Sequence, residues 1–184
     1  MLRTILRRRL RAFERQWGYD AAYMRDLLDA SPWTFIRFGF VTALGRTKGA
    51  PAEAMAAAGI VGTLSEDCGP CTQISVDMAT AQGVKPDVIR AILVGDRLAM
   101  GEAAALGYSF ARAVLDRDLE GADAARDEIT RRWGKKAVVA LSLTLTTARM
   151  YPNLKYGLGH GRSCTKVIVA GVSSPFSFAE PVAV

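Results

Sequence analysis

Residues 54–71 read AMAAAGIVGTLSEDCGPC, a run of small apolar side chains followed by a polar turn and two cysteines. The alanine-rich first part shows no strand-like alternation, and its composition favours a helix that begins at Pro51 and ends near Leu64. Pro70 suits the first turn of a second helix, which we expect to end near Gln82, before Gly83. Two helices joined by a cysteine-bearing turn predict an α-helical core.

Helical periodicity continues along most of the chain, and no segment before residue 165 alternates with the period of a strand. Residues 121–133 are polar and charged, and the tail from residue 157 is rich in glycine and serine, with one β-leaning run at residues 167–169. We therefore predict an all-α, single-domain helical bundle. The remaining expected helices are 2–17, 21–30, 32–44, 86–94, about 99–119, and 135–150, the last ended by Tyr151-Pro152.

A chain of 184 residues fits one structural domain. Within it we expect basic and apolar N-terminal helices over residues 1–49, a helical core over 50–150 and an irregular C-terminal tail over 151–184.

Composition limits the class of protein. Half of the residues are hydrophobic and 23% are charged, which excludes intrinsic disorder. Three cysteines are too few for a secreted disulfide scaffold. No segment has the apolar core of a signal peptide, and the longest apolar stretches are shorter than a bilayer span of about 20 residues. We expect a soluble, cytoplasmic protein.

The net charge of +6 is concentrated at the N-terminus, where six arginines and one glutamate lie within the first fifteen residues. No nucleic-acid recognition motif accompanies this basic helix, and we predict no nucleic-acid partner. The helix could make weak contact with an anionic membrane surface or an acidic partner. We favour the simpler reading that its apolar side chains pack on the domain or on a sister subunit, these being Leu2, Leu6, Leu10, Phe13 and Trp17.

The pair Cys68 and Cys71 carries the most specific chemistry in the sequence. Free N–H groups and the positive dipole at a helix start stabilise a thiolate, which attacks disulfides and peroxides. Helix-end electrostatics and solvent access favour Cys68 as the attacking residue. Ser75, one turn beyond Cys71, could hydrogen-bond its sulfur or relay a proton. Glu66 could deprotonate a thiol or hold the loop, and Asp67 is a candidate helix cap.

Two other interpretations stay open. The cysteines could be an inert buried pair. They could also bind zinc together with His160 and Cys164. The glycine and proline between the cysteines favour redox chemistry, and we predict no metal or cofactor. His160 lies among glycines and is expected to be exposed, Cys164 is expected to be structural or idle, and the three tryptophans (Trp17, Trp33 and Trp133) are expected to lie in the core.

The tetrapeptide CGPC also occurs in thioredoxin, but there it follows a β-strand, whereas residues 54–64 are predicted to be helical. Residues 56–71, the segment MATAQGV at 78–84 and residues 89–96 instead resemble the carboxymuconolactone decarboxylase and AhpD-like family. The resemblance covers roughly residues 50–118. It implies an all-helical homo-oligomer that acts as a thiol-dependent peroxidase or disulfide reductase, with an external dithiol as reductant.

The family resemblance implies that Cys71 attacks the peroxide and Cys68 resolves the product. Two positions depart from the family pattern, because Ser75 stands in place of a histidine and Ala56 in place of a glutamate. Serine is not a general base at neutral pH without a partner. We expect the Glu66 carboxylate to take the place of the missing general base. The competing hypothesis is a helical oligomeric scaffold or binding protein whose proton relay has decayed.

Overall fold

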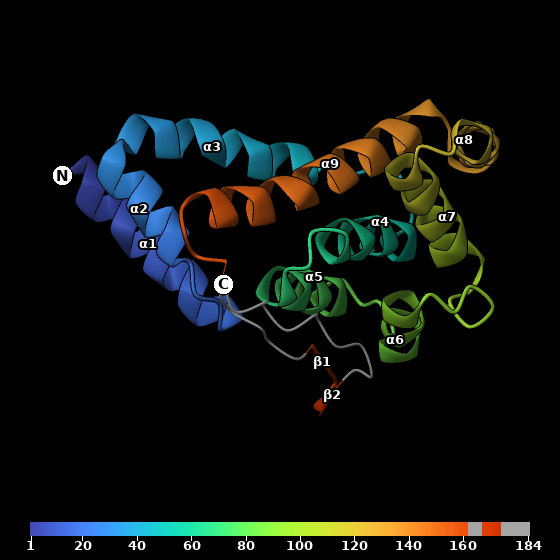
Figure 1. Cartoon of the computed structure of the whole chain (residues 1–184), viewed down its shortest axis with the longest axis horizontal. Helices are drawn as coiled ribbons and strands as arrows, with labels where there is room; N and C mark the ends of the chain where they lie inside the picture. Colours follow the sequence, from blue (N-terminus) through green and yellow to red (C-terminus); the bar gives the residue numbers. More distant parts are fainter. Residues whose placement is uncertain (162–166, 174–184) are drawn as a thin grey trace, which may run out of the picture.

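The alanine-rich segment forms α4 (Ala52–Leu64), which lies at the centre of the molecule with other helices packed around it (Figure 1). The computed structural model describes residues 1–161 and 167–173. Small side chains let the neighbouring helices approach closely. A Cβ added at Gly107 would lie 2.5 Å from the carbonyl oxygen of Ala54, and one at Gly62 would lie 3.1 Å from that of Leu145.

The described residues are almost entirely helical, so the all-α prediction is confirmed. The other helices are α1 (Leu2–Trp17), α2 (Ala22–Ala30), α3 (Pro32–Gly45), α5 (Gly69–Ala81), α6 (Pro86–Val94), α7 (Glu102–Asp116), α8 (Leu119–Trp133) and α9 (Lys135–Gly157).

Two buried clusters share α4. On one side, Ile60 packs with residues of α5 and α6, including Val76 and Ile92. On the other side, Val61 packs with residues of α7, α8 and α9, including Phe110 and Leu141. No residue of α4 is exposed, and apart from Glu53 and Thr63 the helix is apolar on all sides rather than amphipathic.

A third cluster joins the N-terminal helices to the rest of the molecule. Leu10, Tyr19 and Tyr23 pack against Ile74 of α5 and Leu154 of α9. Leu6 and Leu10 are buried, as expected, whereas Leu2 is exposed. The apolar side of α1 therefore contacts this same chain, although not along its whole length.

Residues 119–133, for which polar composition gave no helix prediction, form α8. Arg117 adopts a left-handed conformation that ends α7, and the Asp118 side chain accepts from the Gly121 N–H at 2.9 Å to cap α8. Only Ala125 and Ile129 of this helix are buried. A helix on the outside of the bundle needs only a narrow apolar stripe, which explains its charged composition.

The predicted position for the end of the last helix was wrong. Instead of stopping at Tyr151-Pro152, α9 continues through a buried Pro152 to Gly157, so residues 151–157 do not belong to an irregular tail. Proline removes one helical hydrogen bond. Next to it, the Asn153 side-chain amide donates to the Arg149 carbonyl at 2.7 Å and supports the helix at this point.

The prediction of a buried Trp33 was also wrong, since 66% of its surface is exposed. Trp17 and Trp133 are partly buried and pack against the clusters described above. No residue of α3 is fully buried.

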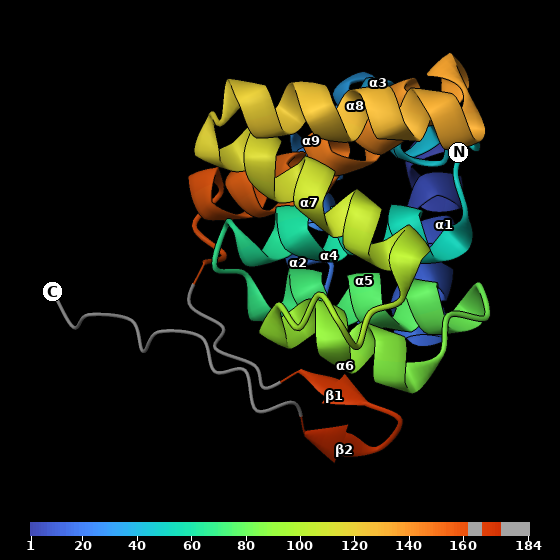
Figure 2. The same ribbon diagram turned by 90° about the vertical axis from the view of Figure 1, so that its right-hand side faces the viewer.

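The β-leaning run forms a short antiparallel hairpin, β1 (Ile168–Val169) and β2 (Val172–Ser173), which lies beside α5 and α6 (Figure 2). Gln73 of α5 holds it by two bonds to the backbone of Ile168, at 3.0 and 2.7 Å.

Among residues 1–161 and 167–173, none of the helices is long and apolar enough to cross a bilayer.

Candidate functional site

Cys68 and Cys71 lie at the start of α5 and are joined by a disulfide, with their Cα atoms 5.3 Å apart. Cys68 is the N-cap residue, but no side chain caps the helix. Asp67 is therefore not the cap that we expected, and its backbone adopts a left-handed φ of 51°. Both cysteines are buried, with exposed fractions of 3% and 2%, so the greater solvent access expected for Cys68 is not found.

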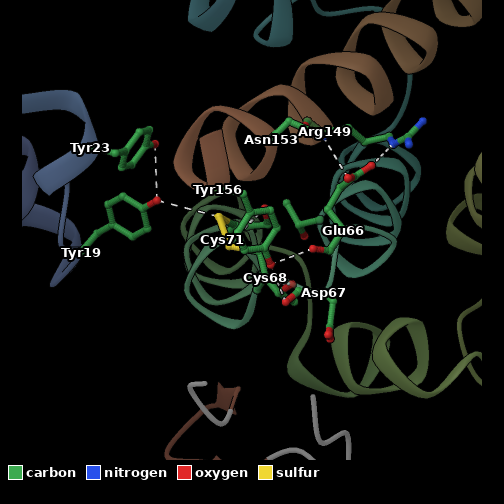
Figure 3. The surroundings of a disulfide bond; sticks show 12 residues. Tyr19, Tyr23, Glu66, Asp67, Cys68, Cys71, Arg149, Asn153 and Tyr156 are labelled. Carbon is green, nitrogen blue, oxygen red and sulfur yellow. Dashed lines mark hydrogen bonds and ion pairs between the residues drawn. A yellow bond between two sulfur atoms is a disulfide. The ribbon is translucent and has the colours of Figure 1, made fainter. Parts of the chain in front are cut away.

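Glu66 holds the cysteine turn against α9. Its carboxylate accepts from the Arg149 guanidinium and from the Asn153 amide, the latter at 2.9 Å. Figure 3 shows this carboxylate pointing toward α9 and away from the sulfur atoms. Of the two roles considered for Glu66, the geometry favours holding the loop over deprotonating a thiol, because both carboxylate oxygens already accept hydrogen bonds.

Tyr156 is a second link between α9 and the turn. Its hydroxyl lies within donating distance of the carbonyl oxygens of Glu66 and Asp67, at 2.9 and 2.8 Å (Figure 3). The expected end of α9 at residue 150 left both Asn153 and Tyr156 outside the helix. Sequence analysis therefore missed the element that fastens the site.

Ser75 does not contact the sulfur of Cys71. Its hydroxyl donates to the Cys71 carbonyl oxygen at 3.0 Å, and Thr72 bonds the Cys68 carbonyl in the same way. This back-bonding is usual for hydroxyl side chains within helices. The predicted bond from Ser75 to sulfur is absent, and Ser75 acts here as a helix residue.

Among the described residues, Tyr19 brings a side-chain hydroxyl to the cysteine pair. It lies between α1 and α2, and its hydroxyl oxygen is 3.9 Å from Cys71 Sγ and 3.4 Å from the Tyr23 hydroxyl (Figure 3). Both tyrosines are buried. Burial raises the pKa of the Tyr19 and Tyr23 hydroxyls above their usual value of 10, so both remain protonated donors at neutral pH.

Lys155 lies over the ring of Tyr19. Its Nζ is 6.0 Å from the centroid of the Tyr19 ring, and burial lowers the pKa of the ammonium group. Sequence reasoning missed Tyr19 and Lys155, because they lie 52 and 84 positions away from Cys71 in the chain. No local spacing links them to the cysteines.

The residues considered as zinc ligands do not form a site in the part of the chain described. His160 is partly buried rather than exposed, and its Nε2 lies 2.6 Å from Asp26 Oδ2. Cys164 lies outside the described residues. No three histidine, cysteine or acidic residues come together there to hold an ion.

A shallow pocket of about 330 Å³ lies between α4, α6 and α7, lined by residues that include Ser65, Tyr108 and Arg112. Neither cysteine lines it. The CxxC turn therefore lies outside this pocket.

Comparison of the chain with protein-family models, with curated proteins and with solved structures gives no match. The arguments for function therefore rest on the sequence motif and on this geometry.

Proposed function

We propose that this protein is an AhpD-like thiol oxidoreductase that reduces a peroxide or a disulfide through the Cys68–Cys71 pair. The observation that carries the proposal is the placement of a CxxC pair at a helix start, with the hydroxyl of a buried tyrosine 3.9 Å from Cys71 Sγ. A phenol in this position is a donor for a thiolate, and it supports the pair without the family's histidine.

The reaction would proceed in two steps. The Cys71 thiolate attacks a peroxide oxygen, the O–O bond breaks to release an alcohol after protonation, and Cys71 becomes a sulfenic acid. The Cys68 thiol then attacks this sulfur, giving the Cys68–Cys71 disulfide and water. An external dithiol supplies the two electrons and two protons that restore both thiols. With a disulfide substrate, the intermediate is a mixed disulfide instead.

Tyr19 supports Cys71 as the attacking residue. A hydroxyl has a single hydrogen, which Tyr19 can donate to Tyr23 or toward Cys71. A thiolate is charged and accepts the stronger hydrogen bond. On reduction, Tyr19 would therefore donate to Cys71 while Tyr23 donates to Tyr19. Helix-end electrostatics, which favour Cys68, act on Cys71 as well, since it lies only two residues inside α5.

The competing proposal is a helical scaffold of the same family without catalytic activity. Two features favour it: Ser75 bonds a carbonyl oxygen, and Glu66 is engaged by Arg149 and Asn153. Neither then serves as the general base of the usual relay.

Consumption of peroxide with dithiothreitol as reductant separates the two proposals. The enzyme would turn over and Cys71→Ser would abolish turnover. Prereduced Cys68→Ser, assayed after the dithiothreitol is removed, would consume one equivalent of peroxide and leave Cys71 as a sulfenic acid. Tyr151→Phe, at a partly buried tyrosine bonded to Thr42 rather than to the cysteines, is the control and should retain activity. Absence of turnover with both peroxides and small disulfides would contradict the enzyme proposal and favour the scaffold.

A further inference from the structure

The starts of α1 and α3 lie together at one end of the molecule, at the left of Figure 1. Asp29, near the end of α2, joins them. Its carbonyl oxygen accepts from Arg3 at 3.3 Å, and its carboxylate pairs with Arg7 at 2.6 Å. Two residues later, Ser31 caps the first turn of α3 by accepting from the Thr34 N–H. These contacts place the first turns of α1 and α3 next to each other.

This end of the molecule carries exposed apolar side chains. Leu2 and Ile5 of α1 are exposed, as is Trp33 at the start of α3. Phe40 and Leu44 are also exposed and follow Trp33 at helical spacings of seven and eleven, so they extend the same stripe along α3. Nothing within the described part of the chain covers these side chains.

The outward side of α1 is cationic. Four exposed arginines on this helix form neither an ion pair nor a side-chain hydrogen bond with any described residue, namely Arg8, Arg9, Arg11 and Arg15. In the rest of the molecule five arginines pair with carboxylates, namely Arg90, Arg112, Arg126, Arg131 and Arg132. Other cations, such as Arg97 and Arg117, also form no ion pair within the described residues, and α1 differs in carrying four such arginines within eight residues. The charge on α1 is therefore left uncompensated by the fold.

We infer that this end of the molecule, formed by α1 and the stripe of α3, docks on an anionic lipid bilayer surface. Basic helices with apolar flanks bind the headgroup region of anionic membranes, and tryptophan favours the same interface. The buried side of α1 packs on the protein through Leu6 and Leu10. Only the flanking residues can enter the headgroup region, so the contact is shallow and depends on charge.

Charge favours lipid over a second copy of this chain. A self-contact of this surface would bring two sets of unpaired arginines together, which is unfavourable. Nucleic acid would satisfy the arginines but not the exposed Trp33, Leu2 and Ile5. A bilayer surface satisfies both kinds of side chain, and the inference does not depend on the proposed redox activity.

Sedimentation of the full-length protein with vesicles tests this inference. The vesicles contain phosphatidylcholine alone or with about one quarter phosphatidylglycerol. We expect binding to the anionic vesicles only, with strong loss as salt rises from roughly 0.1 to 0.5 M. Replacing Arg8, Arg9, Arg11 and Arg15 by Gln should lower partitioning more than about tenfold.

Two matched controls lie elsewhere on the surface. The charge-matched control replaces four other exposed cations by Gln, these being Lys85, Arg97, Arg117 and Lys135. For the apolar contribution, Trp33→Ser should weaken binding severalfold, whereas Leu98→Ser, at a residue that is 98% exposed on the α6–α7 loop, should not. Circular dichroism and urea unfolding confirm that each variant folds.

Three results would overturn the inference. The first is equal binding to neutral and anionic vesicles, and the second is equal loss in the test and control variants. The third is the absence of vesicle binding, with the arginines instead supporting oligonucleotide binding, or Trp33 instead supporting self-association in sedimentation velocity.

Discussion

At the scale of single residues, Tyr19 distinguishes the two cysteines. Its hydroxyl oxygen lies 3.9 Å from Cys71 Sγ, and no comparable side-chain donor is found for Cys68 among the described residues. Tyr19 is itself fixed by an edge-to-face contact with Phe13 and by the Tyr23 hydroxyl. The N-terminal helices therefore position a hydrogen-bond donor at a site whose cysteines come from α5.

Replacing Tyr19 by Phe should slow alkylation of reduced Cys71 near neutral pH by about tenfold, because a hydrogen bond to a charged acceptor is lost. The measurement is the rate of iodoacetamide modification at Cys71, followed by peptide mass across about pH 5 to 9. The midpoint of the profile should move to higher pH in Tyr19→Phe and stay in place in Tyr151→Phe. Identical profiles in all three proteins would remove Tyr19 from the site.

The buried tyrosines also predict how stability depends on pH. Burial raises the pKa of Tyr23, so the folded state keeps a phenolic proton that the unfolded chain loses near pH 10. Its contribution to stability is complete below about pH 10 and is lost as the pH rises through the higher folded-state pKa. Lys155 has the opposite sign, since burial lowers its pKa and the folded state gains stability as the ammonium loses its proton.

The change Tyr23→Phe isolates the tyrosine contribution. Urea unfolding at about pH 8 and about pH 11 should show a smaller loss of unfolding free energy in Tyr23→Phe than in the unmodified protein. An equal or larger loss in the variant would contradict burial of the Tyr23 hydroxyl.

At the scale of helices, small residues let neighbouring helices pack closely against α4. Gly107 of α7 contacts the backbone of α4 so closely that a Cβ there would lie 2.8 Å from Ala54 Cα. A neighbouring backbone cannot move aside as a flexible side chain can. Gly107 is thus required for the short distance between two helices rather than for a turn.

Adding one methyl group tests this packing. Gly107→Ala should lower the unfolding free energy by about 1–3 kcal/mol, because it overpacks the α4–α7 contact. Gly39→Ala, in α3 with no atom within 4 Å of the added Cβ, should raise it by about 0.5–1 kcal/mol. Urea unfolding measures both. Equal effects of the two substitutions would contradict the close approach.

Also at this scale, the sequence predicted most of the helices and failed at two of them for physical reasons. Apolar composition, periodicity and stop signals located α1 to α7, although α7 runs from Glu102 to Asp116 rather than from about residue 99 to 119. The pattern missed α8, where an outer helix buries only Ala125 and Ile129. It also ended α9 too early. Proline usually stops a helix, but here α9 continues through Pro152, which packs in the interior, and this packing cannot be read from the local sequence.

At the scale of the whole molecule, the site is assembled from segments far apart in the chain. The CxxC motif could be predicted because its residues are adjacent in sequence. Tyr19, Lys155 and Tyr156 could not, since only the tertiary fold brings α1, α2 and α9 to the start of α5 (Figure 3). The helical spacing within α5 alone predicted a hydrogen bond from Ser75 to the Cys71 sulfur, whereas the Ser75 hydroxyl donates to the Cys71 carbonyl oxygen.

The central claim is that Cys68 and Cys71 form a reversible redox pair. Its most direct test is a redox titration of the purified protein in glutathione or dithiothreitol buffers, with trapped thiols alkylated and mapped by peptide mass. Zinc is assayed on the same sample. The account predicts two-electron formation of the Cys68–Cys71 disulfide at roughly −200 to −300 mV. Thiols that never pair across this range, or stoichiometric zinc bound to them, would contradict it.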